Sequence, residues 1–129
     1  SAASDVYKRQ DYNHVRNQYF AHWEKVKKTY SVPYYPNVTM GWDPTPRTNQ
    51  EKPWKGNQVY PYTNTIGNNT PENFKRALQM TKERLLNDPD SPRIININCW
   101  NEWTEGSYLE PDVVHGYDYL KAVKAVFSK

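Results

Sequence analysis

Cysteine, long apolar runs and an excess of one charge are all lacking in this sequence of 129 residues. The single Cys99 excludes an internal disulfide framework and a cysteine-based zinc site. No stretch approaches the roughly 20 apolar residues of a membrane-spanning helix, so we expect no membrane span. The formal net charge is only +3. Basic residues are interleaved with acidic ones, which argues against a nucleic-acid partner.

Aromatic residues are abundant, at 15% of the chain, while the mean hydropathy of −1.05 is very polar. A chain this polar does not build a large aliphatic core. Aromatic rings among Asn, Thr and Pro suit a sugar-binding cleft, because ring faces stack on the CH faces of sugars and polar groups bind the hydroxyls. The same composition is equally typical of a small domain whose aromatic residues pack in its core, so composition alone does not decide between a sugar-binding cleft and a core.

Residues 1–10 (SAASDVYKRQ) resemble the in-frame translation of a sequencing adaptor, and such a segment is excluded from reasoning about the fold. We therefore expect the natural sequence to begin near Asp11 and residues 11–129 to form the domain segment. We also expect residues 1–10 to pack against nothing. A natural N-terminal tail is the alternative.

Three segments have the three- and four-residue apolar spacing of amphipathic helices. The first spans residues 11–31 and ends before Pro33, the second begins at Thr70 and Pro71, and the third spans residues 116–127. The stripes expected to be buried are Tyr12, Val15, Tyr19, Trp23, Val26 and Tyr30, then Phe74, Ala77, Leu78, Thr81 and Leu85, and finally Tyr117, Leu120, Val123 and Phe127.

Two segments are predicted strands, residues 37–42 (NVTMGW) and residues 93–100 (RIININCW). In the second, Ile95, Ile97 and Cys99 share one face, which we expect against the helices, and Asn96, Asn98 and Trp100 share the other. Alternation of helices and strands predicts a parallel sheet with right-handed crossovers. Residues 43–70 form a long loop, and its aromatic residues Trp54, Tyr60 and Tyr62 favour a functional one.

The chemistry-bearing motif is CWNEWTEGSYLEPD, residues 99–112, directly after the second strand. Glu102 and Glu105 are three apart, so a turn places both carboxyls on one side, and Gly106 lets the backbone bend away. Paired carboxyls beside Trp100 and Trp103 suit one acid and one base, as glycosidic cleavage requires. From spacing alone, an exposed loop with two solvated glutamates is favoured over a catalytic pair.

WNEWTEG followed by YLEP resembles the signature of the glycoside hydrolase family 99-like proteins, which include the WbsX group of polysaccharide biosynthesis. GWDPTPR, residues 41–47, resembles an upstream block of the same family. The resemblance implies an α/β fold, the C-terminal portion of a (β/α)₈ TIM barrel with about two strand–helix units. It covers residues 12–127.

The resemblance also implies a retaining, endo-acting α-mannosidase that uses the sugar 2-hydroxyl as nucleophile. Glu102 would deprotonate that hydroxyl, and Glu105 would be the general acid. The substrate-binding residues would be Trp100, Asn101, Trp103, Trp42, Asp43, Arg47 and Tyr108, although Asp43 and Arg47 could instead pair with each other. No cofactor or metal is implied, and the partner is a polysaccharide or oligosaccharide.

The sequence departs from the characterised hydrolases of this family at Thr104, where they carry His, and at Ser107 and Tyr108. It resembles the WbsX-type branch more closely, which puts the mannose specificity in question more than the carboxylate chemistry. The alternatives are therefore a WbsX-type protein of surface polysaccharide transfer or assembly, and a non-catalytic glycan-binding module. Two retained glutamates favour catalysis, since binding alone requires no acid–base pair.

We predict that residues 11–129, purified alone, aggregate or unfold over a broad denaturant range and show no glycosidase activity. Two strands cannot close a barrel, and folding must offset about 1–2 kcal/mol of backbone entropy per residue with little buried apolar area. A denaturant melt with an activity assay tests this. A sharp cooperative transition together with turnover would show that the segment is a whole domain.

Overall fold

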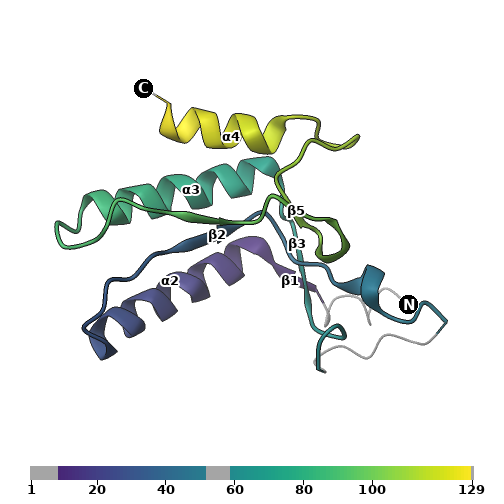
Figure 1. Cartoon of the computed structure of the whole chain (residues 1–129), viewed down its shortest axis with the longest axis horizontal. Coiled ribbons are helices and arrows are strands. Elements are labelled where there is room, and N and C mark those ends of the chain that lie inside the picture. Colours follow the sequence, from purple (N-terminus) through teal and green to yellow (C-terminus); the bar gives the residue numbers. More distant parts are fainter. Residues whose placement is uncertain (1–8, 52–58, 129) are drawn as a thin grey trace.

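The computed structural model describes residues 9–51 and 59–128, which form a mixed α/β arrangement of helices and short strands (Figure 1). The helices are α2 (Tyr12–Thr29), α3 (Pro71–Leu86) and α4 (Asp118–Phe127). In Figure 1, α3 lies between α4 and α2, and it contacts both helices. The mixed α/β class is therefore as predicted, while the described residues form short two-stranded sheets and no closed barrel.

Two parallel strand pairs and one hairpin make up the sheets. The two strands predicted from the sequence pair with each other, as β2 (Asn37–Thr39) and β4 (Asn96–Asn98), and both are shorter than expected. The hairpin consists of β5 (Asn101–Glu102) and β6 (Ser107–Tyr108). The carboxyl ends of β2 and β4 lie at the same edge, because the strands are parallel.

A second parallel pair joins β1 (Arg9–Asp11) to β3 (Thr65–Gly67). Strand β3 lies inside the predicted long loop, where no alternating pattern indicates a strand. Its Ile66 N–H donates to the Trp42 carbonyl at 2.8 Å, so β3 also contacts the end of the β2 segment. Trp54 of the same loop lies outside the described residues.

Strand β1 includes two residues of the segment expected to be foreign. Arg9 and Gln10 lie opposite Thr65 and Ile66 in the strand pair. The expectation that residues 1–10 pack against nothing is therefore wrong for Arg9 and Gln10, and residues 1–8 lie outside the described residues. The foreign origin of the segment stays a prediction.

Helix α3 is the centre of the core. Its predicted stripe is confirmed, because Phe74, Ala77, Leu78, Thr81 and Leu85 are all buried. The Thr70 side chain accepts a hydrogen bond from a backbone N–H of the first turn, and Pro71 occupies the first helical position. The stripe packs on β2 and α4, so the helix face that the sequence identified is the one that holds the domain together.

Helix α4 presents a different face from the predicted one. Tyr119, Ala122 and Val126 are buried, whereas Tyr117 is 63% exposed and Phe127 is 40% exposed. Tyr119 selects this face because its ring packs edge-on against Phe74, at 5.6 Å between centroids, and its hydroxyl donates to the Asn69 carbonyl. The predicted stripe is therefore wrong for Tyr117 and Phe127, whereas Val123 does pack against the core.

Helix α2 begins at its cap Asp11, whose carboxylate accepts from two backbone N–H groups. Its buried residues are Tyr12, Phe20 and Trp23, and the last two form a cluster with Leu85. Tyr30, expected in the stripe, is instead 61% exposed because the helix has already ended.

Strand β4 keeps the predicted alternation. Ile95, Ile97 and Cys99 are half-buried, while Asn96, Asn98 and Trp100 are exposed. Ile95 and Ile97 pack against the core clusters but are incompletely covered. They line an apolar groove of about 480 Å³ together with Lys82, Leu85, Leu86, Arg93, Val123 and Phe127. Within residues 9–51 and 59–128, no helix is long and apolar enough to cross a membrane.

Replacing the central core ring tests this packing. Phe74 is fully buried, so Phe74→Ala, made in the complete natural protein that contains this segment, should lower the free energy of unfolding by about 3–5 kcal/mol. Glu83→Ala is the control on the same helix, because Glu83 is exposed away from the buried stripe and its loss should cost about 0.5 kcal/mol or less. Equal effects in a denaturant titration would contradict the assigned core.

Candidate active site

The motif after β4 folds back on itself as a hairpin. Strand β5 ends at Glu102, the 3₁₀ turn η2 (Trp103–Glu105) reverses the chain, and β6 returns beside β5. Gly106 follows the turn with φ +58°, the left-handed conformation that costs glycine little and other residues more. Glu102 directly precedes the turn and Glu105 ends it. A 3₁₀ turn has three residues, so the two side chains leave the backbone on the same side.

A buried hydroxyl fixes this hairpin to the parallel strands. Ser107 is fully buried, and its Oγ donates to the Asn98 carbonyl at 2.9 Å. The same oxygen lies 3.1 Å from Oγ1 of Thr39 and accepts from the Asn98 side chain at 3.1 Å. The Asp43 N–H also donates to the Glu105 carbonyl at 2.6 Å. Glu105 is therefore held by the segment that follows β2 as well as by its own hairpin.

Arg47 brings the two glutamates together. It ends the 3₁₀ turn η1 (Thr45–Arg47), which contacts η2. Its Nη2 lies 2.5 Å from Oε1 of Glu102, and its Nε lies 3.5 Å from Oε1 of Glu105. The hydrogen bond to Glu102 raises the pKa of Arg47, so the guanidinium keeps its charge. One guanidinium thus contacts both carboxylates. The side chain of Glu102 is 42% exposed and that of Glu105 is 19% exposed.

Tyr60 is a site residue that the sequence identified only as an aromatic of the long loop. Its hydroxyl donates to Oε1 of Glu105 at 2.6 Å. That hydrogen bond raises the pKa of Tyr60, so the phenol stays protonated and remains a donor. Its ring lies 6.2 Å from the ring of Trp42, whose indole nitrogen donates to Thr63 at 3.0 Å. Trp42 therefore packs near Tyr60, and Tyr60 in turn contacts Glu105.

Trp103 and Tyr108 form a stacked pair on the hairpin. Their ring centroids are 3.8 Å apart with an interplanar angle of 14°. The Trp103 indole nitrogen donates to Oε2 of Glu110 at 2.6 Å, and the Tyr108 hydroxyl donates to Oδ2 of Asp112 at 2.9 Å. Burial raises the pKa of Tyr108 to about 12, and the hydrogen bond to Asp112 adds to this. Both rings are therefore anchored at their polar ends.

The remaining predicted residues play other parts. Asp43 accepts from the N–H of Thr45 at 3.0 Å and from its hydroxyl at 2.6 Å, which forms a local turn just before η1. The Asp43–Arg47 pair left open by the sequence does not form among the described residues, because Arg47 binds the glutamates. Trp100 is 53% exposed, and its carbonyl accepts from the backbone that follows β6. Asn101 is exposed on β5.

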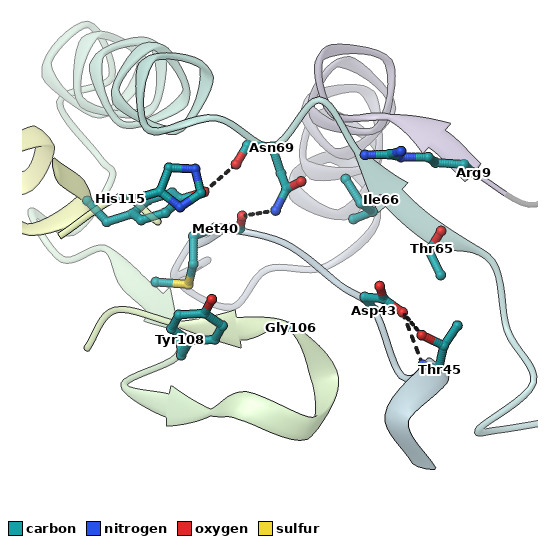
Figure 2. Close-up of a pocket in the computed structure, with 11 residues that line it drawn as sticks. Arg9, Met40, Asp43, Thr45, Thr65, Ile66, Asn69, Gly106, Tyr108 and His115 are labelled. Atoms are coloured by element: carbon teal, nitrogen blue, oxygen red, sulfur yellow. Dashed lines mark hydrogen bonds between the residues drawn. The ribbon is translucent and has the colours of Figure 1, made fainter. Parts of the chain in front are cut away.

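A cavity of about 530 Å³ lies beside this cluster (Figure 2). Figure 2 shows it between the hairpin, β3 and the starts of α3 and α4. Its lining residues are Arg9, Met40, Asp43, Thr45, Thr65, Ile66, Asn69, Gly106, Tyr108, His115 and Tyr119. Glu102 and Glu105 are not among the residues that line this cavity. In the described part of the chain, no three His, Cys, Asp or Glu side chains are grouped as metal ligands.

Comparison with known proteins agrees with the motif. The family described as glycosyltransferase WbsX matches residues 2–123. The uncharacterized protein WxcX of Xanthomonas campestris pv. campestris, found in two strains, is 36% identical over 96 residues. These residues cover 74% of this chain and 12% of WxcX, so the chain spans a small part of its relatives' length. No solved structure matches.

The matched family is the one whose WbsX group the WNEWTEG motif resembles. This chain belongs to the WbsX glycosyltransferase family, as the match over residues 2–123 shows. The WbsX part of the predicted resemblance is therefore confirmed. Its glycoside hydrolase part, and the roles of the individual site residues, stay predictions.

Two glycines test how tightly the turn is packed. Gly106 and Gly116 have similar left-handed φ values of +58° and +53°, but a Cβ on Gly106 would lie 3.0 Å from Cβ of Asp43, whereas Gly116 faces open space. In the complete natural protein, both Ala variants should lose about 1–2 kcal/mol of stability from backbone strain. Gly106→Ala should lose more and also reduce activity. Equal losses in thermal unfolding would show that Asp43 does not restrict the turn.

Proposed function

We propose that this chain supplies the acid–base pair of a protein that cleaves or transfers glycosidic bonds in a polysaccharide. The observation that carries the proposal is the convergence of Glu102 and Glu105 on Arg47. Both glutamates follow β4, and the arginine follows β2, so they meet at the carboxyl edge of a parallel strand pair. Enzymes built on (β/α)₈ barrels keep their chemistry at that edge.

We assign the fold, as part of the same proposal, to the C-terminal portion of a (β/α)₈ barrel. The order β2, α3, β4, α4 with β2 and β4 adjacent and parallel is that of two consecutive strand–helix units. The open apolar groove beside Ile95 and Ile97 lies on the helix-facing side of β4, where a further unit would pack. These features support a portion of a barrel more than a free-standing domain.

The surroundings of the two glutamates suit different roles. Glu102 has the shorter contact with Arg47 and the more exposed side chain, which suits a base that an incoming hydroxyl must reach. Glu105 has the longer contact and the less exposed side chain, and the Tyr60 hydroxyl fixes its carboxyl in place, which suits an acid that must meet one leaving oxygen. This assignment agrees with the roles that the family resemblance implies.

The reaction then has two steps. Glu102 accepts the proton of the sugar 2-hydroxyl while that oxygen attacks the anomeric carbon, and Glu105 gives its proton to the leaving glycosidic oxygen. Water or an acceptor hydroxyl next opens the epoxide-like intermediate at the anomeric carbon. Glu105 takes the proton of the incoming oxygen, and Glu102 returns its proton to the 2-oxygen. Two inversions at the anomeric carbon retain its configuration.

Hydrolysis and transfer differ only in the group that opens the intermediate. The family description favours transfer to a sugar acceptor, and the resemblance of the motif to endo-acting α-mannosidases favours water. A glycan-binding module without catalysis would explain the aromatic rings. It would not explain two carboxylates held by one guanidinium.

Glutamine variants of the pair, made in the complete natural protein, test the roles. Glu102→Gln should reduce turnover about 10²–10⁴-fold on every substrate, because no other base replaces it. Glu105→Gln should reduce turnover as strongly on a natural glycan but much less on an aryl glycoside, whose good leaving group requires little acid assistance. Rates are measured with matched glycan and aryl substrates, with and without a sugar acceptor.

Glu24→Gln is the matched control, since Glu24 also pairs with an arginine, Arg84, at 2.9 Å but lies on α2. It should leave turnover unchanged. Equal loss on both substrate types in Glu105→Gln would argue against the acid role. Full activity in both site variants would show that this chain does not supply the acid–base pair.

A further inference from the structure

We propose that the face of Trp103 turned away from Tyr108 is a preformed platform on which one neutral pyranose ring of the glycan stacks. The platform rests on the proposed function, since it would seat the glycan on which Glu102 and Glu105 act. Its evidence is separate, because it depends on how the aromatic rings and two further carboxylates of the hairpin are arranged.

The position of Trp103 is fixed on two sides. Tyr108 covers one face at 3.8 Å, closer than the about 4.5–7 Å that paired aromatic rings prefer. Glu110 holds the indole nitrogen at 2.6 Å. The carboxylates of Glu110 and Asp112 each accept a hydrogen bond from one of the two rings and hold the stack at its polar ends. The indole is therefore oriented before any ligand arrives.

The rest of the indole is open. Trp103 is 45% exposed although one face and the nitrogen are already occupied, so the exposed area belongs to the opposite face and edge. Exposure of a large apolar ring face to water is unfavourable in free energy. Because the ring is already held in place, a ligand that covers this face causes little further loss of side-chain entropy. The stack is thus arranged as a binding surface as well as a support for the hairpin.

The polar groups around this face select a sugar. Asn101 and Thr104 lie close to Trp103 in the sequence of the hairpin and are exposed, and the Thr104 hydroxyl donates to Glu102 at 3.3 Å. An exposed apolar ring on a hairpin that also carries amide, hydroxyl and carboxylate groups matches a pyranose, which has an apolar CH face and a rim of hydroxyls.

The charge around the platform selects a neutral sugar. The carboxylates of Glu102, Glu105, Glu110 and Asp112 lie on this hairpin or directly after it, and Arg47 compensates only the first two. The Asp112 side chain also contacts His115, and burial opposes its ionisation. The backbone N–H of His115 and the Tyr108 hydroxyl nevertheless keep the Asp112 pKa below its usual value. A uronic acid would bring a further negative charge to this surface.

Fluorine NMR of the fluorotryptophan-labelled complete natural protein tests the platform, and Trp103→Phe identifies the Trp103 signal by its loss. The probes are methyl α-mannoside, methyl α-glucoside, methyl α-glucuronide and mannitol, which has the hydroxyls without the ring. We expect the Trp103 signal to shift saturably with the two neutral pyranosides, more weakly with the glucuronide and not with mannitol. Affinity measured by calorimetry should fall about tenfold in Trp103→Ala and less in Trp103→Phe, which keeps a ring.

Tyr30→Ala is the control, because Tyr30 is an exposed aromatic residue at the end of α2 and should leave binding unchanged. The measurements are repeated in Glu105→Gln, where turnover is lost but stacking should persist. Binding that persists with no glutamate-dependent turnover would overturn the proposed function and leave the platform standing. An absence of any saturable Trp103 shift, or unchanged affinity in Trp103→Ala, would overturn the platform even if turnover depends on both glutamates.

Discussion

The arrangement of this site depends on the Ser107 hydroxyl, which is buried where β2, β4 and the hairpin meet. Asn98 of β4 and Thr39 of β2 both contact this single oxygen atom. A buried hydroxyl without partners would be costly, so the hairpin can occupy only a position in which these bonds are made. The glutamates, the stacked rings and the contact with Arg47 all follow from that one position.

The sequence identified elements whose signal is local. The stripe of α3 and the alternation of β4 repeat at the period of their own structure, and each buries the side that the repeat predicts. Helix α4 is apolar on more than one side, so its period could not decide which side packs. Tyr119 decides it through Phe74 and the Asn69 carbonyl, and both lie far away in the sequence.

The site was predictable to a similar extent. The motif after β4 identified Glu102 and Glu105 because both belong to one short segment. The partners that complete the cluster come from elsewhere: Arg47 was identified only by resemblance, and Tyr60 only as one aromatic among several in a loop. Strand β3 has three residues and no alternating pattern, so pairing with β1, and not its own composition, makes it a strand. Long-range partners of this kind leave no periodic signal.

Two glycines define how closely the two family blocks approach each other. A Cβ on Gly41 would lie 2.9 Å from the Gly106 carbonyl oxygen, and a Cβ on Gly106 would lie 3.0 Å from Asp43. The blocks GWDPTPR and WNEWTEG, distant in the sequence, therefore share one contact in which neither partner can gain a side chain alone. A substitution at either glycine would therefore require the other block to move, although β3, α3 and β4 separate the two blocks along the chain. The two blocks are thus one packed unit of the site, also joined backbone to backbone by the Asp43 N–H and the Glu105 carbonyl.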